Sequence, residues 1–366
     1  MECIKIVDPR KKVVLFLSDP ADITRERKAY LAAFEQNNVT VVCVKDTELK
    51  RTIANINNDI ICILYPDPCN ALIPDDILQY NIPTACFQID AYDGTAARFR
   101  QSMLFDYAFI FHPEYDELLK KQGHSGAILL PHAVETNLYP SFNKNRTIEV
   151  GWVGRLDGSF YKNRKEQVEA ISRKFTMNNI FRFYNRKELI EVYTNSKIAV
   201  NISRDDYMID ANLRCFEIMA SGALLLTKMP TELTALPLNE GEHFVGYTDT
   251  ENLLAKIEYY LEHDSERIQI ALNGYKAVNE KHDFYHRAAK IIELIQTTNH
   301  QKIAPAKSWN KQKVNQVLFE YYSHRRILLR TLKYGFLVLF SRYTKPYYVF
   351  KNIARMIFLN FKFYIK

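Results

Sequence analysis

Short, wholly apolar runs alternate with helix-length segments through the first third of the chain. The run at 13–17 is followed by a segment, 21–36, in which apolar residues recur at helical spacing. The runs that continue the series, each expected to be a strand, are 39–44, 59–64, 84–88, 106–111 and 128–130. Runs that are apolar throughout are typical of parallel strands covered by helices on both faces. The pattern predicts a doubly wound α/β domain.

The same alternation starts again after residue 147. Strands are expected at 148–153, 181–184, 197–202 and 223–227, and helices at 162–175, 186–194, 212–220 and successively through 249–295. A polar stretch, 143–145, is a suitable linker between the two series. We therefore expect two Rossmann-like domains, over 1–143 and 144–298, that face each other across a cleft, which is a preferred place for ligands.

The character of the chain changes near residue 299. The segment 309–366 mixes tyrosine, phenylalanine, leucine and isoleucine with lysine and arginine, and its apolar residues recur at roughly helical spacing. Its longest uncharged apolar run, 334–341, is much shorter than the ~20 residues that cross a bilayer. A basic, aromatic, helical C-terminal tail over 299–366 is predicted, and it is not expected to span a membrane.

The net charge of +7 conceals a strong asymmetry. From residue 301 onward the chain has fourteen basic residues and one acidic residue, Glu320, whereas the first 300 residues carry a net charge of −6. Two interpretations of this tail remain open. It lies on an anionic membrane as interfacial helices, or its first part, 309–330, packs back on the first domain. No nucleic-acid motif accompanies the charge, and we expect no nucleic-acid partner.

Bulk composition fits a cytoplasmic globular protein. With 47% hydrophobic and 25% charged residues, the chain can bury ordinary cores. Its six cysteines form no C-x-x-C pair and lie mostly in apolar runs, which predicts reduced, buried thiols. The first eight residues lack the apolar core of a signal peptide. We expect the protein in the cytoplasm, with peripheral association with the inner face of the cell membrane as the extension that the tail suggests.

The segment 201–227 is the most informative about chemistry. Asn212 is expected near a helix N-terminus, where free backbone N–H groups and the helix dipole favour a phosphate. Glu217 follows about one turn later, where a carboxylate can accept both hydroxyls of a ribose, at roughly 1.5–3 kcal/mol for each hydrogen bond. Gly222 is expected to end the helix. The alternative is that Asn212 is an ordinary cap and Glu217 a solvated residue, but the apolar neighbours of Glu217 argue for burial.

These residues carry a family resemblance. The segment 213–223, Leu-Arg-Cys-Phe-Glu-Ile-Met-Ala-Ser-Gly-Ala, resembles the R-x-F-E-x-M-A-x-G-A motif of bacterial GT-B glycosyltransferases, in the group that includes spore-maturation glycosyltransferases and is akin to family four. Further segments that resemble family positions are 150–155, 161–164, 196–201 and 282–287, and more loosely 88–90, 106–109 and 130–133. The resemblance spans about residues 80–295 and is most specific in the second domain.

The resemblance implies a donor site in the second domain. In that family the motif glutamate binds the donor ribose, which implies Glu217 here. The glycine turn after the first strand of the second domain faces the diphosphate, together with one of Lys162 or Arg164, although a solvated basic helix start is the alternative for these cations. The donor-binding residues inferred are Gly154, Arg155, Lys162, Arg164, Asn212, Arg214, Glu217 and His132, the last of which otherwise satisfies a backbone carbonyl.

The catalytic residues are less well defined by the pattern. The family typically has a second glutamate eight positions before the first, and that position is Ile209 here. Asp206 and Asp210 lie beside it, and we expect one of the two near the donor sugar. Asp210 is the one that we assign to the catalytic residues. Asp90 ends a strand of the first domain and is the candidate acceptor base of an inverting reaction. Its alternative is to cap the next helix.

No D-x-D triplet, phosphate-binding P-loop or zinc ligand set occurs in the chain. GT-B enzymes generally need no divalent metal, because basic groups and a helix N-terminus neutralise the leaving diphosphate. We therefore expect no metal and no cofactor other than the donor substrate. The expected function is the metal-independent transfer of a sugar from a nucleotide-diphosphate sugar to a glycan, lipid-linked or cell-surface polysaccharide acceptor. The alternative, kept open by Ile209, is a non-catalytic GT-B protein with a structural or assembly function.

Overall fold

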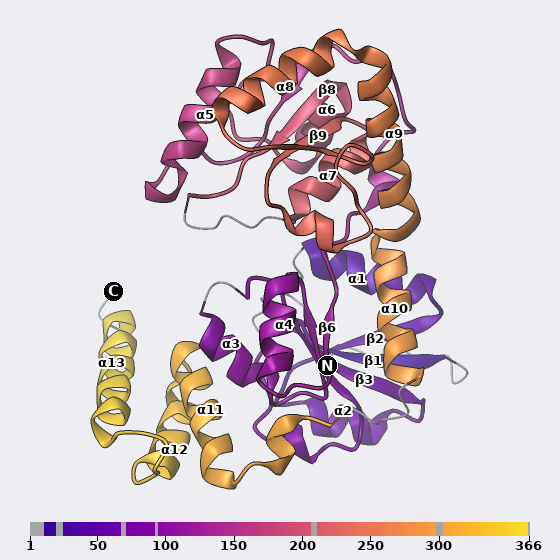
Figure 1. The fold of residues 1–366 in the computed structure, drawn as a ribbon. Coiled ribbons are helices and arrows are strands. Elements are labelled where there is room, and N and C mark those ends of the chain that lie inside the picture. The colour runs from indigo at the N-terminus through magenta and orange to yellow at the C-terminus, as the bar shows by residue number, and fades with distance from the viewer. Residues whose placement is uncertain are drawn as a thin grey trace. The chain divides into compact units, whose positions relative to one another are not determined.

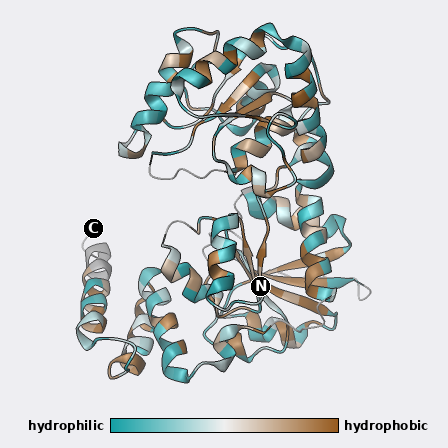
Figure 2. Cartoon of the chain, viewed as in Figure 1, coloured by the Kyte–Doolittle hydropathy of each residue, from teal (hydrophilic) through white to brown (hydrophobic). Residues whose placement is uncertain are grey.

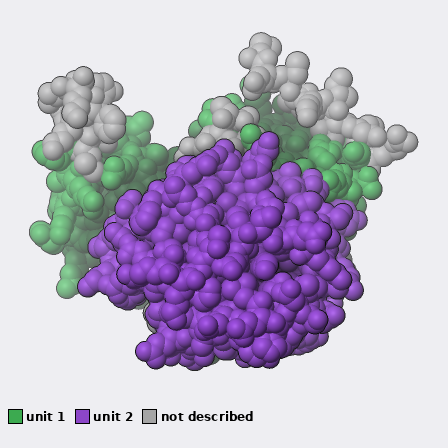
Figure 3. Space-filling model, turned by 90° about the horizontal axis from the view of Figure 1, so that it is seen from above, with its two compact units in different colours: residues 1–130, 290–366 green, residues 131–289 purple. Residues whose placement is uncertain are grey.

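The computed structural model describes residues 11–19, 25–66, 71–91, 94–205, 211–297 and 303–364. The chain forms two compact units, shown in different colours in Figure 3. Unit 1 comprises Met1–Leu130 and Lys290–Lys366, and unit 2 comprises Pro131–Ala289. These divisions differ from the predicted ones at 143/144 and 298/299, because the C-terminal tail belongs to unit 1 and the segment 131–143 belongs to unit 2.

Unit 1 contains a six-stranded parallel sheet with the strand order β2-β1-β3-β4-β5-β6 (Figure 1). The strands are β1 Lys12–Leu17, β2 Val39–Val44, β3 Ile60–Tyr65, β4 Thr84–Gln88, β5 Tyr107–Ile110 and β6 Ala127–Leu129. Each predicted strand of this half is therefore present, with ends displaced by at most one residue. Figure 2 shows these strands as predominantly hydrophobic, as required for a sheet that is covered on both faces.

Seven helices of the described residues surround or extend this sheet, and an eighth joins the units. They are α1 Arg25–Gln36, α2 Leu49–Asn55, α3 Thr95–Ser102, α4 Pro113–Lys121, α11 Lys311–His324, α12 Leu328–Val338 and α13 Pro346–Tyr364, with α10 Phe284–Thr297 at the junction. None of the helices in the described ranges has the length and apolar character needed to span a bilayer. The four cysteines described, Cys43, Cys62, Cys86 and Cys215, are free thiols, as expected.

The start of the C-terminal tail is part of the unit 1 core. Tyr321 and Tyr322 of α11 are buried in the same cluster as the strand residues. The hydroxyl of Tyr321 lies 3.0 Å from the hydroxyl of Tyr65 and accepts the N–H of Ile73 at 3.0 Å. The buried carboxylate of Asp106 holds the preceding segment, accepting the N–H of Ala304 at 2.8 Å. Residues 309–324 thus pack on the first sheet, which was the second of the two expectations for this part of the tail.

Unit 2 contains a four-stranded parallel sheet with the strand order β10-β9-β8-β7. The strands are β7 Ile148–Gly151, β8 Ser196–Asn201, β9 Leu224–Lys228 and β10 Val245–Tyr247. The helices are α5 Lys162–Ser172, α6 Arg186–Asn195, α7 Leu213–Ser221, α8 Thr250–Glu262 and α9 Asp264–Lys281. Both units are therefore α/β domains with parallel sheets, and the predicted two-domain fold class is confirmed.

The strand predicted at 181–184 is absent. Phe181 and Phe183 are 70% and 84% exposed, so the apolar run that suggested a strand is not buried. The β7 edge is instead continued by residues 176–178. The N–H of Val150 donates to the carbonyl of Thr176 at 3.1 Å, and Val150 and Met177 form an isolated parallel bridge. The amide of Asn178 then accepts the N–H of Trp152 at 2.9 Å and donates to the carbonyl of Trp152 at 2.8 Å.

The C-terminal end of α7 is fixed by Gly222 and Arg146. Gly222 has φ 73°, in the left-handed region, as predicted for the residue that ends this helix. A Cβ atom at Gly222 would lie 2.7 Å from the ring of Phe142 and 2.8 Å from a guanidinium nitrogen of Arg146. Arg146 donates to the carbonyl oxygens of Tyr193, Ser196 and Ser221 at 3.1, 3.0 and 2.8 Å. Burial lowers the pKa of Arg146 to about 10, so the group stays charged at neutral pH.

Candidate donor site in unit 2

A buried asparagine links the carboxyl end of β8 to the first turn of α7. Asn201 is the last residue of β8 and is fully buried. Its side-chain oxygen accepts hydrogen bonds from Arg214 at 2.8 Å and from Asn212 at 3.2 Å, and its amide nitrogen donates to Thr227 on β9 at 3.1 Å. The sequence indicated Asn201 only as the end of a strand. Asn201 could have been recognised as a candidate site residue because it is a polar residue at the end of an otherwise apolar, buried strand.

Asn212 occupies the N-cap position of α7, but its side chain does not cap the helix. Its backbone is extended, with φ −78° and ψ 171°, and its carbonyl accepts the N–H of Cys215 at 3.1 Å. The amide nitrogen of Asn212 is directed at Asn201, and its buried side-chain oxygen has no hydrogen-bond partner within the described residues. The cap expected as the alternative is therefore present in position, without the side-chain hydrogen bond that an ordinary asparagine cap makes. The N–H groups of the first helical turn do not use this side chain as their acceptor.

Arg214 connects α7 to the ends of two strands. Its Nε donates to the carbonyl of Val153, directly after β7, at 3.2 Å, while its Nη1 donates to Asn201 at the end of β8. The guanidinium thus joins the carboxyl ends of neighbouring parallel strands. In open α/β sheets this is the edge at which ligands bind. Asn212 and Arg214, two of the inferred donor-binding residues, are therefore held at that edge by hydrogen bonds to the same residue, Asn201.

Glu217 is a buried carboxylate on the same helix. It is only 4% exposed, so the alternative in which it is a solvated helix residue is wrong. It follows Arg214 by three positions, which places both side chains on one face of α7. Burial is the main cause that raises the pKa of the nearby Tyr193 hydroxyl, with Arg214 acting to lower it and Glu217 to raise it. A buried carboxylate retains its charge only with strong hydrogen-bond or charge partners.

The glycine turn after β7 packs against an aromatic ring. A Cβ atom at Gly154 would lie 2.8 Å from the ring of Trp152, which is itself 1% exposed. Any larger residue would displace the tryptophan or the turn. The close approach of backbone and indole is thus a physical reason for glycine at this position.

The basic residues after this turn divide into one buried and two exposed side chains. Arg164 is buried, with its Nε donating to the carbonyl of Ser203 at 3.2 Å and its Nη1 to the carbonyl of Arg155 at 3.3 Å. Its guanidinium lies 4.7 Å from the ring centre of Tyr161. Arg155 and Lys162 are exposed. Arg164 therefore shapes the loops, and Lys162 is the member of the predicted pair whose charge faces solvent.

His132 lies where unit 2 begins, beside the segment with which it ends. Arg287 donates to the carbonyl oxygens of Pro131 at 3.0 Å and His132 at 3.3 Å, and to Nδ1 of His282 at 2.7 Å. Burial, followed by the charge of Arg287, lowers the pKa of His282 to about 3, so this imidazole is neutral and accepts the hydrogen bond at pH 7. The ring of His282 also contacts Phe216 of α7 at a centroid distance of 5.4 Å.

The catalytic candidates are not brought together by the described residues. Asp90 follows β4 in unit 1 and is half-buried, whereas the donor residues lie in unit 2. Asp206, Ile209 and Asp210 lie outside the described residues. Within the described ranges, no group of three or more histidine, cysteine, aspartate or glutamate side chains could hold a metal ion. The arrangement that the structure does define is the set on α7 with the ends of β7 and β8.

Comparison with known proteins agrees with this location. Residues 147–293 match a protein family described as glycosyl transferase-like. The match includes β7, α7 and the 282–287 segment, and so contains every inferred donor residue except His132. No curated protein matches the chain.

Solved structures with the same fold are distant in sequence. HepE from Anabaena, in complex with UDP, has a TM-score of 0.56 at 12% identity, over 78% of this chain and 100% of that chain. A glycosyltransferase from Rickettsia africae has a TM-score of 0.56 at 11% identity, over 80% and 100%. Sucrose-phosphate synthase from Thermosynechococcus elongatus has a TM-score of 0.55 at 13% identity, over 79% and 99%. At these identities the likeness establishes the fold.

Proposed function

We propose that this chain is a group 1 glycosyltransferase with the GT-B fold, and that it transfers a sugar from a nucleoside-diphosphate sugar that binds to unit 2. The family match over residues 147–293 supports the assignment of the donor to this unit. Two structures of the same fold, HepE with UDP and an Escherichia coli protein with UDP-2-fluoro glucose, support a nucleotide sugar as the donor. UDP is the first nucleotide to test on this ground.

The observation that carries the proposal is the buried carboxylate of Glu217 on α7. Asn201 and Arg214 fix the start of this helix against the ends of β7 and β8, so the carboxylate is held on a rigid element. We propose that Glu217 accepts the two ribose hydroxyls of the donor. Each such charged hydrogen bond contributes roughly 1.5–3 kcal/mol.

The diphosphate is proposed to lie against the glycine turn and the first turn of α7. Arg155 and Lys162 are exposed cations on this part of the chain, and Asn212 leaves the first helical turn without its side-chain acceptor. Positive groups and a helix N-terminus stabilise the charge that develops on a leaving diphosphate. We propose that they do so without a divalent metal, so that activity should persist when EDTA is present.

Asp90 and Asp210 remain the proposed catalytic residues. Asp90 would act as the base toward the acceptor hydroxyl, and Asp210 would lie near the donor sugar. We propose that the side chain of His132 contacts the donor. Its backbone is held in place because its carbonyl accepts a hydrogen bond from Arg287. Substitution of each aspartate by asparagine should lower kcat more than it raises KM, because a proton acceptor or charge is lost while the binding surface is kept.

The acceptor is proposed to be a glycan that is lipid-linked or belongs to a cell-surface polysaccharide. The basic, aromatic tail supports this class, because an enzyme that modifies a membrane-bound acceptor gains from positive charge near anionic lipid. The place of action would then be the cytoplasm, at the inner face of the cell membrane.

A donor panel tests the proposal. UDP, GDP and ADP sugars are first compared by thermal shift, since a ligand at one hundred times its Kd stabilises the folded state by about 2.7 kcal/mol. The selected donor is then assayed for transfer and for slow hydrolysis, with and without EDTA. The account predicts one preferred nucleotide and measurable turnover that EDTA does not abolish. Binding without turnover would favour the non-catalytic alternative, and no stabilisation by any donor would contradict the proposal.

A further inference from the structure

The helix α12 has two apolar faces, and only one of them is covered. Tyr334, Gly335 and Val338 are buried within unit 1. On the opposite side, Leu329, Phe336 and Phe340 are 79%, 77% and 88% exposed. Leu332 and Leu337 are also exposed. The four residues within the helix follow the spacing of a single helical face, and Phe340 follows in the turn after α12. We name these five residues, Leu329, Leu332, Phe336, Leu337 and Phe340, the α12 patch.

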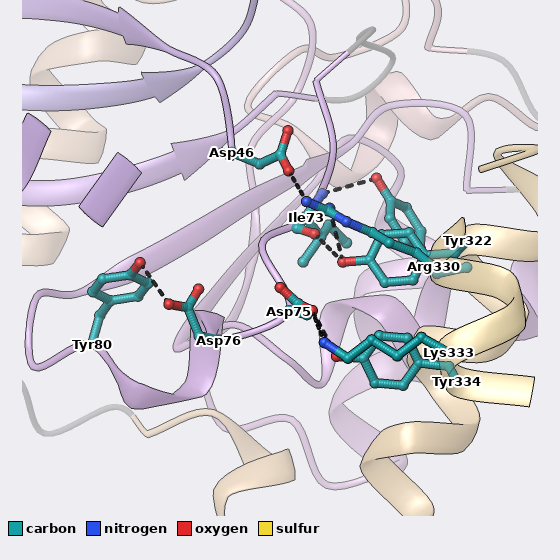
Figure 4. A network of polar contacts seen from close by, with 10 residues as sticks. Asp46, Ile73, Asp75, Asp76, Tyr80, Tyr322, Arg330, Lys333 and Tyr334 are labelled. Atoms are coloured by element: carbon teal, nitrogen blue, oxygen red, sulfur yellow. Dashed lines mark hydrogen bonds and ion pairs between the residues drawn. The ribbon is translucent and has the colours of Figure 1, made fainter. Parts of the chain in front are cut away.

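Ion pairs determine which side of α12 faces outward. Figure 4 shows Arg330 directed to Asp46, and Lys333 and Tyr334 directed to Asp75. Lys333 donates to Asp75 at 2.6 Å, and the hydroxyl of Tyr334 donates to the same oxygen at 3.0 Å. The charged groups of α12 therefore pair with carboxylates of unit 1, although the Lys333 side chain is 55% exposed, and the other side chains of the outward face are apolar.

The next helix has a similar exposed face that also carries cations. Tyr347, Phe350 and Phe358 of α13 are 74%, 59% and 61% exposed, and Lys351 and Arg355 are exposed on the same helix. Helix α13 packs on α12 through its other side, where Val349 and Met356 are buried. A Cβ atom at Gly335 would lie 2.9 Å from Ile353, which shows how closely these two helices approach. Figure 1 shows α12 and α13 as neighbours beyond α11.

Charge indicates the kind of partner that this surface fits. Residues 321–366 contain no aspartate or glutamate, and Arg326, Arg342 and Lys345 are exposed around the loops at the ends of α12. A second copy would bring cations against cations, which is unfavourable at close range. Aliphatic side chains such as Leu329 and Leu337 offer no stacking platform for nucleic-acid bases. An anionic lipid surface supplies hydrocarbon for the apolar side chains and negative headgroups for the cations.

We propose that α12 and α13 form a docking surface for an anionic lipid bilayer, on which they lie without crossing it. Phe336 and Phe340 enter the interfacial region, while Lys351 and Arg355 contact the headgroups. Helix α11 is excluded from this surface, because Val317–Phe319 and Tyr321–Tyr322 are buried in unit 1. The inference concerns the tail and does not depend on the donor site.

Vesicle binding by the full-length protein tests this surface. Wild type is sedimented with vesicles of phosphatidylcholine alone and of phosphatidylcholine mixed with phosphatidylglycerol. Phe336→Ser combined with Phe340→Ser should lower the partition coefficient at least about tenfold, because two large apolar side chains are lost from the interface. The matched control is Phe181→Ser with Phe183→Ser in unit 2, which are equally exposed phenylalanines. The control should bind like wild type.

The contribution of the α13 cations to vesicle binding is tested separately. Lys351→Gln with Arg355→Gln should lower binding roughly tenfold or more on anionic vesicles and leave binding to neutral vesicles unchanged. Lys174→Gln with Lys187→Gln, which are exposed in unit 2, should have no effect. Added salt should weaken wild-type binding. Nucleotide binding by every variant should equal that of wild type, which separates this test from that of the donor site.

Two results would overturn the proposal. One is equal sedimentation of the patch variants and their controls on anionic vesicles. The other is a wild-type dimer, detected by sedimentation velocity, that Phe336→Ser with Phe340→Ser converts to monomer while vesicle binding is unchanged, because the α12 patch would then bind a second copy of the chain.

Discussion

Three guanidinium groups, of which Arg287 is buried and Arg146 and Arg214 are half-buried, fix the ends of elements in unit 2. Arg146 binds carbonyl groups at the ends of α6 and α7, Arg214 joins β7 to β8, and Arg287 joins the first and last segments of the unit. Helix and strand ends leave carbonyl oxygens without partners in their own element. One guanidinium has five N–H donors and can satisfy several of them at once. Helix α7 is therefore positioned from both ends by arginine.

Removal of Arg146 should destabilise the protein measurably. Arg146→Met keeps much of the side-chain volume but removes the donor that Arg146 supplies to the carbonyls of Ser196 and Ser221, and leaves the carbonyl of Tyr193 with the N–H of Ser196 alone. A buried acceptor without a partner costs about 1–3 kcal/mol, so we expect a loss of at least about 2 kcal/mol in the free energy of unfolding from urea titration. Arg173→Met, at an exposed arginine after α5, is the control. Equal stability of the two variants would contradict this function of Arg146.

His282 should make the protein sensitive to acid. Its pKa is lowered from 6.5 to about 3 by burial and then by Arg287. Between these values the unfolded chain binds a proton that the folded chain excludes, so stability is complete above pH 6.5 and falls as the pH falls toward 3. From pH 7 to 5 the loss that arises from His282 should be up to about 2 kcal/mol.

His282→Gln isolates this contribution, because glutamine still offers Arg287 an acceptor but does not titrate. Urea unfolding at pH 7 and pH 5 should show a smaller loss for this variant than for wild type. His324→Gln, at an exposed histidine of α11, should lose as much as wild type. A His282→Gln variant with an unchanged pH dependence would show that the imidazole does not remain neutral when it is buried.

At the scale of elements, α12 shows how one helix can be fixed and yet leave an apolar face exposed. Asp46 and Asp75 bind its cations, and Tyr334 and Val338 enter the unit 1 core. Burial alone raises the pKa of Asp75, but the hydrogen bonds from Lys333 and Tyr334 outweigh it, and the pKa falls below 3.8. The stability that Asp75 gives to the packing of α12 on unit 1 is therefore present at neutral pH and is lost as the pH falls through this lowered pKa.

Asp75→Asn should loosen α12 specifically. The variant loses the ion pair with Lys333, and we expect amide hydrogen exchange of 328–338 at pH 7 to accelerate roughly fivefold or more, as a contact of about 1 kcal/mol or more is lost. Exchange in the β1–β5 strands should not change. Asp59→Asn, at an exposed aspartate before β3, is the control. If α12 exchanges at the wild-type rate in Asp75→Asn, this network does not hold the helix.

The sequence pattern predicted most elements but not the contacts between them. Short, largely apolar runs gave the unit 1 strands and three of the four unit 2 strands, because buried strands commonly carry such runs. The run at 181–184 was misleading, since two exposed phenylalanines give the same local pattern as a buried strand. The short β10 was not predicted. Glu217 and Gly222 could be placed from a motif and a helix end, whereas nothing local distinguishes the half-buried Arg146 from a surface arginine.

At the scale of the whole molecule, the chain leaves unit 1 at residue 130 and returns to it at residue 290. The predicted separate tail is consequently the last part of unit 1, and long-range contacts such as that between Tyr321 and Tyr65 make it so. The pattern of apolar residues along the sequence does not show that a C-terminal segment packs on an N-terminal domain. The charge division is nevertheless informative, because residues 301–366, which contain helices α11–α13, carry a net charge of +13 and the first 300 residues carry −6.

We thus place the donor in unit 2 and the lipid surface on α12 and α13 of unit 1. These two assignments make independent predictions: loss of Phe336 and Phe340 should affect vesicle binding without affecting nucleotide affinity, and loss of Glu217 should do the reverse. Both measurements use the full chain, so a variant that merely fails to fold would be recognised by the loss of both activities.

Calorimetric titration of UDP and 2′-deoxy-UDP into wild type and Glu217→Gln would decide whether Glu217 binds the ribose, with GDP and its deoxy form used instead if the donor panel selects guanine. Glu258→Gln, at an exposed glutamate of α8, is the matched control. Wild type and control should bind the ribonucleotide at least about tenfold more tightly than the deoxynucleotide, since a charged hydrogen bond of roughly 1.5–3 kcal/mol is lost with the 2′-hydroxyl. Glu217→Gln should bind both nucleotides weakly and with nearly equal affinity. A variant that retains the full preference for the ribonucleotide would contradict the assignment of the ribose to Glu217.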